Sequence, residues 1–420
     1  MNQTVKFACP LDCFDACGLL AEVVDGRVVS LKGNPDHPLT QGRICVKGKK
    51  LLERLYHPQR LRTPRLKDGQ KWQTLSWTAA IDIIARQFEN AIRTHGRQSI
   101  LYYADSGYGG LAKSVDQLFF NRLGGVSSPR GSLCWAAGMA AQRYDFGDVR
   151  GHAPHDLANA RGILIWGRNP VATNPHLVPF LKKARQKGAT LIVIDPLKTL
   201  SARQADIHLQ PQPGTDGVLA LGMIHHLLAT GRIDETFINR HSLGFNRFTK
   251  SLTDFTPEHA AAITGLNADM ICRTAEHYAD QSPASIIIGM GLQRYANGGQ
   301  TVRCIDALAA VTGNIGRSGG GVNYANRSIT RWVDREGGAV PEAPPPDTRT
   351  FPLPRMARFI RTAANPPIAV MMIAKANPLV QMPDTRAMQA AFAQVPFKIV
   401  IDMFMTDTAQ AADLVLPCTS

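Results

Sequence analysis

Four cysteines near the beginning of this 420-residue chain constrain it more than any other feature. Cys9, Cys13 and Cys17 are spaced four residues apart, and Cys45 follows later, within the run RICVKG. Three thiols close in sequence, together with a fourth that the fold can bring back beside them, can face a single compact metal centre. Four thiolates are the ligand set of a [4Fe–4S] cluster, so the spacing predicts that these cysteines hold one.

Two other uses of the four cysteines stay open, a structural zinc site and a disulfide pair. Zinc sites usually take their ligands in C-x2-4-C pairs, whereas these cysteines are grouped as three plus one. Disulfides are disfavoured because the chain begins MNQTVKFACP, with no secretory signal pattern and no twin arginine. The pattern favours the cluster and predicts a cytoplasmic protein.

The formal net charge of +14 raises the question of a nucleic-acid partner. The basic residues are dispersed, the densest group being Lys47-Gly48-Lys49-Lys50, and no nucleic-acid-binding motif is visible. A phosphate-rich cofactor or an acidic protein partner explains the charge equally well, and we expect no nucleic acid. No apolar run reaches the eighteen or so residues of a membrane span, so we expect no direct span.

The order of elements predicts an α/β fold of three parts. Two β-rich runs flank Asp25-Gly26, which indicates a hairpin and a small iron–sulfur β subdomain at residues 1–60. Strands then alternate with helices, and the short apolar runs GILIW and TLIVI are typical of buried parallel strands. We predict two doubly wound αβα domains, one discontinuous (61–138 and 326–420) and the other inserted at 139–325.

Polar residues and glycines follow several of the predicted strands. In open parallel sheets, ligands bind beyond the carboxyl ends of the strands, and helix N-termini there bind phosphate. Each such motif alone is explained by turn and capping needs, but their number favours dinucleotide binding. No G-x-G-x-x-G with an acidic residue about twenty positions later is present, so NAD is not indicated. The positions are Gly167, Asn169, Asp195, Gly214 and Asp216 in one half, and Asn377 and Asp402 in the other.

An ordered set of motifs spans nearly the whole chain: CPLDCFDAC, RICVKG, ILIWGRNP, PGTDGVLALGM, GMGLQR, ALAAVTGNIGRSGGG and FMTDTAQAADLVLP. In this order they resemble the molybdenum or tungsten bis-(molybdopterin guanine dinucleotide) oxidoreductases, the superfamily of dimethyl sulfoxide reductase and formate dehydrogenase. The resemblance implies a [4Fe–4S] cluster and a bis-(molybdopterin guanine dinucleotide) cofactor that carries molybdenum or tungsten.

The resemblance also implies roles for single residues. Lys47 would lie between cluster and pterin on the electron path, and Gln293 would lie near the pterins. Cys134 stands where the family places its metal ligand, and a thiolate suits a metal already held by sulfur; a buried structural thiol is the alternative. One dinucleotide would be held by Asn169, Asp195 and Asp216, with Gly167 and Gly214 beside it, and the other by Asn377 and Asp402.

The implied function is two-electron redox of a small substrate, with electrons passing through the cluster to a redox partner, either a ferredoxin-like protein or an iron–sulfur subunit. Two departures from the family pattern bear on it. Trp135 stands where formate dehydrogenases carry histidine, which disfavours formate. The chain also stops before the β-barrel domain of the family, so we expect these residues alone to be inactive. The alternatives are an electron-transfer subunit without molybdenum and an inactive truncated member.

Overall fold

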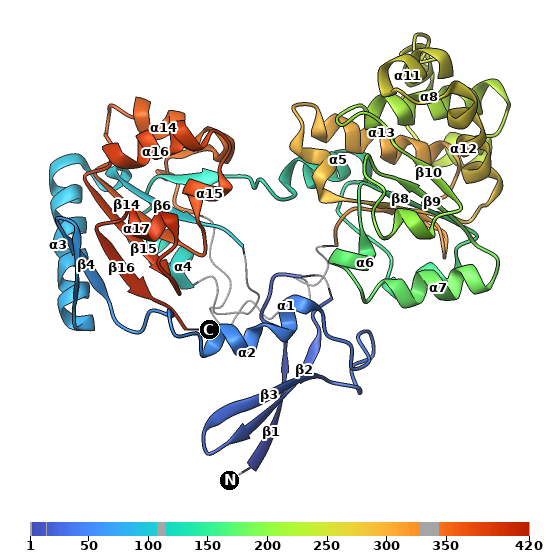
Figure 1. The fold of residues 1–420 in the computed structure, drawn as a ribbon. Coiled ribbons are helices and arrows are strands. Elements are labelled where there is room, and N and C mark those ends of the chain that lie inside the picture. Colours follow the sequence, from blue (N-terminus) through green and yellow to red (C-terminus); the bar gives the residue numbers. More distant parts are fainter. Residues whose placement is uncertain (1, 14, 107–114, 327–343, 420) are drawn as a thin grey trace. The chain divides into compact units, whose positions relative to one another are not determined.

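The computed structural model describes residues 2–13, 15–106, 115–326 and 344–419. The chain forms two compact units, residues 1–132 with 334–420, and residues 133–333 (Figure 1). The sequence-based boundaries, 138/139 and 325/326, stay predictions, and the units divide near them. Cys134 lies within the inserted unit because the helix that follows it packs there, against α13 (Gly298–Val311).

The cysteine-rich N-terminal segment is a small antiparallel sheet followed by two short helices. Its strands are β1 (Asn2–Ala8), β2 (Gly18–Val24) and β3 (Arg27–Gly33), in that order. Asp25 and Gly26 connect β2 to β3 with φ values of 48° and 75°. A type I′ turn needs positive φ at both central residues, and the predicted hairpin is confirmed.

The first unit also contains a six-stranded sheet, in the order β5-β4-β16-β15-β14-β6. β6, before the insertion, pairs in parallel with β14, after it, so that Ile100 lies opposite Val370. Figure 1 shows α3 on one side of this sheet and α14 and α16 on the other. Its strands are β4 (Arg65–Asp68), β5 (Lys71–Thr74), β6 (Ile100–Ala104), β14 (Val370–Ala374), β15 (Phe397–Asp402) and β16 (Leu414–Pro417), and a separate parallel pair is formed by β7 (Ser128–Arg130) and β13 (Thr350–Pro352). The helices described in this unit are α1 (Val46–Lys49), α2 (Leu51–Leu55), α3 (Trp77–His95), α4 (Val115–Arg122), α14 (Met356–Thr362), α15 (Pro378–Gln381), α16 (Thr385–Gln394) and α17 (Asp407–Gln410).

The second unit is a five-stranded parallel sheet in the order β10-β9-β8-β11-β12. Successive residues of its central strand β8 point into different cores. Ile163 and Ile165 pack with Leu181 of α7, whereas Leu164 and Trp166 pack with residues of α8 and α13. The strand is therefore covered on both faces, as its unbroken apolar run predicted, and the α/β fold class is confirmed.

The elements of the second unit have the following bounds. The strands are β8 (Gly162–Trp166), β9 (Thr190–Ile194), β10 (Ile207–Leu209), β11 (Ala284–Ile288) and β12 (Gly321–Asn323). Besides α13, the helices described are α5 (Ala136–Phe146), α6 (Pro170–Thr173), α7 (Val178–Gln186), α8 (Asp216–Ala229), α9 (Glu235–His241), α10 (Phe245–Lys250), α11 (Pro257–Thr264) and α12 (Ala268–Asp280). Across the described part of the chain, no helix combines the length and the apolar character needed to cross a membrane.

A buried carboxyl group, Asp306, and a half-buried one, Asp145, lie where α5 packs against α13. Arg303 Nε donates to Asp145 Oδ1 at 2.7 Å, and Gln142 Nε2 donates to Asp306 Oδ1 at 3.0 Å. The remaining oxygen of each carboxyl group is buried without a hydrogen-bond donor within the described residues. Burial raises the pKa of both groups, most strongly that of Asp306, and the negative charge of the nearby Asp145 adds to the rise at Asp306. We predict that the pair holds one proton, which would satisfy both oxygens and leave a single negative charge beside Arg303.

We expect Asp306→Asn to change how stability depends on pH. A carboxyl group whose pKa is raised by folding stabilises the protein below its unfolded pKa of about 4, and this contribution is lost as pH rises through the folded value. The thermal midpoint of the wild type should therefore fall, relative to that of Asp306→Asn, between about pH 4 and neutrality. Asp269→Asn, a change on the exposed face of α12, serves as the control. Parallel pH profiles for the wild type and Asp306→Asn would rule out the shared proton.

Candidate cofactor and metal sites

The four cysteines predicted to bind the cluster come from the end of the β1–β2 sheet and from the start of α1. Cys9 follows β1 and Cys17 precedes β2, and the backbone N–H of Cys9 donates to the carbonyl of Cys17 at 2.7 Å. Cys45 caps α1, where its Sγ accepts from Gly48 N at 3.4 Å. A Cβ on Gly48 would lie 2.7 Å from the Ile44 side chain, so glycine at this position leaves room for Ile44 beside the first turn of α1.

The thiols of this group interact electrostatically. Burial, followed by the nearby Asp15 carboxylate and the thiols of Cys9, Cys13 and Cys45, raises the pKa of Cys17 to about 12. Four thiolates at this spacing repel one another, and a cationic centre removes the repulsion. In the described ranges, no three cysteine, histidine or acidic side chains converge on one ion. A [4Fe–4S] cluster takes one cysteine at each of its four irons, so its ligands surround the cluster without meeting at one ion. The thiols of Cys9, Cys13 and Cys45 all act on Cys17, and the residues therefore fit a cluster.

Lys47 lies on α1, two residues after Cys45, and is exposed. Desolvation raises the pKa of the Cys13 thiol, and the Lys47 ammonium opposes that rise. The single helical turn of α1 therefore places Lys47 close enough to the cysteine group to act on it electrostatically.

Cys134 lies in the loop between β7 and α5 and is half-buried. Its Sγ is 3.7 Å from Met290 Sδ, and it contributes, after burial, to raising the pKa of the Tyr324 hydroxyl. Cys304 differs, because it is buried in α13 and burial raises its pKa to about 11. Cys134 is thus more accessible than a core thiol, as a ligand of an external metal needs to be.

Gln293, in the 3₁₀ turn Met290–Arg294, binds the protein on both sides of Cys134. Its Nε2 donates to the carbonyl of Leu133 at 3.1 Å, and its Oε1 accepts from Gly138 N and from the Tyr324 hydroxyl, both at 3.0 Å. A Cβ on Gly138 would lie 2.3 Å from the Tyr324 ring, so the start of α5 is packed directly against that tyrosine. The sequence-based expectation put Gln293 near the pterins; in the structure its amide holds the loop of Cys134.

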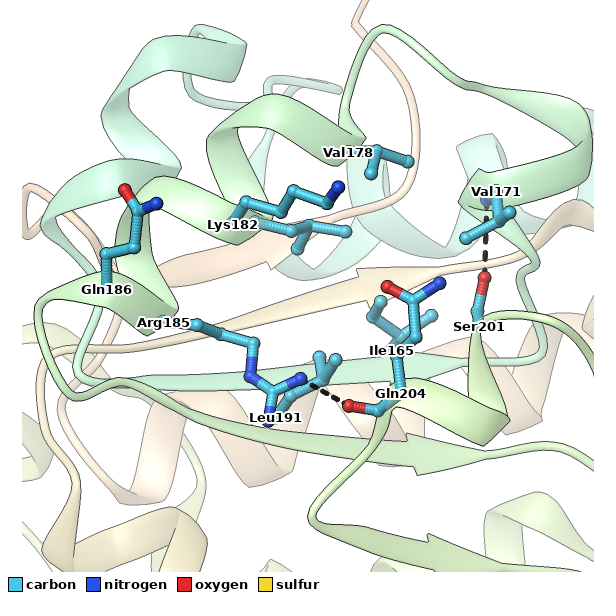
Figure 2. A pocket seen from close by; sticks show the side chains of 10 residues that line it. Ile165, Val171, Val178, Lys182, Arg185, Gln186, Leu191, Ser201 and Gln204 are labelled. Atoms are coloured by element: carbon cyan, nitrogen blue, oxygen red, sulfur yellow. Dashed lines mark hydrogen bonds between the residues drawn. The ribbon is translucent and has the colours of Figure 1, made fainter.

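The first asparagine motif follows β8. Gly167 has φ +62°, and Asn169 caps the short helix α6 with Pro170 at its first position. The Ser201 hydroxyl donates to Asn169 Oδ1 at 2.7 Å. The same hydroxyl accepts from Val171 N at 3.3 Å (Figure 2), at one end of a pocket of about 360 Å³. The sequence analysis did not single out Ser201.

The second asparagine motif, after β14, repeats the first. Lys375 has φ +59°, and Asn377 caps the short helix α15 with a proline at its first position. The Thr408 hydroxyl donates to Asn377 Oδ1 and accepts from Leu379 N at 3.2 Å. Thr408, like Ser201, was not predicted. The two hydroxyl residues share one sequence feature that could have identified them. Ser201 lies six positions after Asp195, and Thr408 lies six positions after Asp402.

The acidic residues lie beside these motifs. Asp195 Oδ1 accepts from Leu197 N at 2.9 Å, and Asp402 Oδ2 accepts from the Thr406 hydroxyl at 2.9 Å. Asp216, at the start of α8, is buried, and its Oδ1 accepts from the Trp166 indole at 2.8 Å. Burial raises the pKa of Asp216, and Asp195 adds to that rise, so these two carboxyl groups lie close to each other.

Gly214 precedes Asp216 with φ +86°, and a Cβ there would lie 3.3 Å from the Tyr295 ring. The second unit thus places Asn169 and Asp195 after the neighbouring strands β8 and β9, with Gly214 and Asp216 at the start of α8. The first unit brings Asn377 and Asp402 together, at the ends of neighbouring strands.

A cysteine-rich β subdomain and α/β units with polar loops at their strand ends are arrangements suited to holding metal centres and nucleotides. Comparison with known families makes the assignment specific. The chain belongs to the molybdopterin oxidoreductase family: residues 60–420 match the family's sequence profile, and residues 2–57, which include all four cysteines, match the molybdopterin oxidoreductase Fe4S4 domain. The family resemblance is confirmed, and these matches indicate a molybdopterin cofactor and a 4Fe–4S cluster.

Two relatives and one solved structure of similar fold can be compared with the chain. The chain is 40% identical to the probable oxidoreductase YyaE of Bacillus subtilis, over 99% of this chain and 62% of YyaE. It is 29% identical to a formate dehydrogenase alpha subunit of Methanocaldococcus jannaschii, over 99% of this chain and 64% of that subunit. The fold is similar to that of acetylene hydratase from Pelobacter acetylenicus, with a TM-score of 0.79 and 23% identity over 97% of this chain and 62% of the hydratase. The chain thus spans less than two thirds of each relative's length.

Proposed function

We propose that the protein carries a molybdenum or tungsten bis-(molybdopterin guanine dinucleotide) centre and catalyses two-electron redox of a small substrate. The observation that carries the proposal is the repeated loop after β8 and β14, in which an asparagine is held by a hydroxyl group. A duplicated loop at the carboxyl end of each sheet suits a cofactor with two similar dinucleotides. A single dinucleotide would need this loop only once.

The metal, when bound, supplies the redox chemistry, and the chain orients it and tunes its surroundings. Cys134 would provide a thiolate to the metal, and Gln293 holds the loop that carries it. The four N-terminal cysteines would hold the cluster that passes electrons singly to a partner protein. One relative is named as an alpha subunit, which supports a separate iron–sulfur or ferredoxin-like partner.

The substrate we propose is a small molecule other than formate. Trp135 follows Cys134 directly, and its ring is partly buried against the hydrophobic core of the second unit. An indole donates a hydrogen bond but does not exchange a proton near neutral pH, as an imidazole does. A reaction that needs a base beside the metal ligand is therefore disfavoured at this position.

Metal and nucleotide analysis of the full-length protein, purified without oxygen, tests the proposal. We expect about four irons and four labile sulfides per chain, together with one molybdenum or tungsten and two guanine nucleotides released by acid. Iron without molybdenum, tungsten or guanine would instead indicate an electron-transfer subunit. Stoichiometric zinc without iron would refute the cluster as well.

We expect Lys47→Met to slow electron transfer between substrate and cluster while both centres stay in place. Removing a partly screened charge near the cluster should raise the activation free energy of electron transfer by about 1 kcal/mol, which slows the transfer roughly fivefold. Rapid-mixing absorbance of cluster reduction by substrate measures the effect. Lys49→Met removes an equal charge from the same helix and should leave the rate unchanged. Equal rates in both variants would refute a role for Lys47.

A further inference from the structure

The side-chain amides of Asn169 and Asn377 are each bound by a buried hydroxyl group. We propose that Ser201 and Thr408 are positioning residues that turn the –NH₂ group of each asparagine toward a hydrogen-bond acceptor, a phosphate or carbonyl oxygen, of a bound dinucleotide. The inference rests on the proposed function, because it names what orients the dinucleotide-binding asparagines.

A backbone N–H can only donate, and this fixes the amide orientation at Asn377. The N–H and the hydroxyl of Thr408 both point to Asn377 Oδ1, the N–H at 3.4 Å, so the atom facing them is the amide oxygen. In the other unit the Ser201 hydroxyl accepts from Val171 N and donates to Asn169 Oδ1, the same orientation. In both asparagines the –NH₂ group then lies on the side away from the hydroxyl.

Burial distinguishes the hydroxyl residue, which positions the amide, from the asparagine, which can bind a ligand. Ser201 is 3% exposed and Thr408 is fully buried, so neither hydroxyl is accessible to a ligand. Asn169 and Asn377 are half-buried. Within the described residues, neither amide nitrogen has a protein acceptor. The asparagine is thus the group able to bind a ligand, and the hydroxyl residue acts through it.

The same arrangement occurs independently in the two units. The hydroxyl residue lies 32 positions after its asparagine in one unit and 31 in the other. The flanking residues differ, because Gly167 occupies the left-handed position before Asn169 and Lys375 occupies it before Asn377. A lysine in that conformation is strained relative to glycine. The same geometry therefore forms even where the local sequence opposes it.

Dissociation of the cofactor from the full-length holoprotein tests the inference. Guanine nucleotide retained per chain is measured by acid release after timed dialysis, for Ser201→Ala and for Thr408→Val. We expect each variant to lose guanine nucleotide about fivefold faster than the wild type, which corresponds to one correctly oriented neutral hydrogen bond. The exchanges Ser201→Thr and Thr408→Ser keep the hydroxyl and should restore retention.

Two control variants separate positioning from general stability. Thr173→Val removes a hydroxyl that donates to the backbone carbonyl of Asn169 rather than to its side chain, and Thr362→Val removes one at an exposed position of α14. Both should keep the wild-type rate of nucleotide loss. Wild-type retention in Ser201→Ala and Thr408→Val, or losses that follow the melting temperature across all variants, would overturn the inference. A wild-type protein without guanine nucleotide would overturn the proposed function itself, and the inference with it.

Discussion

Cys13→Ala is expected to leave the protein without its iron–sulfur cluster, lowering the iron content from about four per chain to below one. Cys13 is exposed and lies outside the small core that contains Cys17, so its replacement removes a ligand without opening a core cavity. The broad visible absorbance that dithionite bleaches should disappear with the iron.

The control for this variant is Cys272→Ala, which removes a half-buried thiol from α12. Its iron content should equal that of the wild type. If Cys13→Ala kept about four irons per chain after anaerobic preparation, the assignment of this cysteine as a ligand would be wrong.

Cys134→Ala should lower turnover by at least about a hundredfold, since changes to groups that merely support a metal ligand already cost ten- to a hundredfold. The molybdenum or tungsten spectrum should change because a thiolate is lost, while the electron paramagnetic resonance signal of the cluster stays intact. These two signals separate loss of a metal ligand from unfolding.

Cys272→Ala again provides the matched comparison, because it removes a thiol from the same unit. Turnover and both spectra should match the wild type. If the two variants behaved alike, Cys134 would be a structural thiol held beside Met290 and nothing more.

Much of the fold could be predicted because its signals are local. The Asp25-Gly26 turn and the apolar runs of β8 and β9 each depend on a few neighbouring residues. The family assignment was equally accessible, because the order of short motifs along a chain is a property of the sequence. The roles of Cys134, Asn169 and the other candidate site residues stay predictions.

The contacts that support the site could not be predicted from local sequence signals. Gln293 binds the carbonyl of Leu133, 160 positions away, and the charge of Asp145, on another helix, contributes to the raised pKa of Asp306. Ser201 is an ordinary buried serine until β8 and β9 are placed side by side and its hydroxyl meets Asn169.

The sequence by itself therefore determined the element types, the grouping of the four cysteines and the family, because turn geometry, burial periodicity and motif order act over short stretches of chain. The tertiary structure alone decided which hydroxyl meets which asparagine, which side chain holds the loop of Cys134, and that Cys134 lies in the inserted unit. Each of these depends on how helices and strands distant in sequence pack, and a hydrogen bond forms only when packing brings donor and acceptor within about 3 Å.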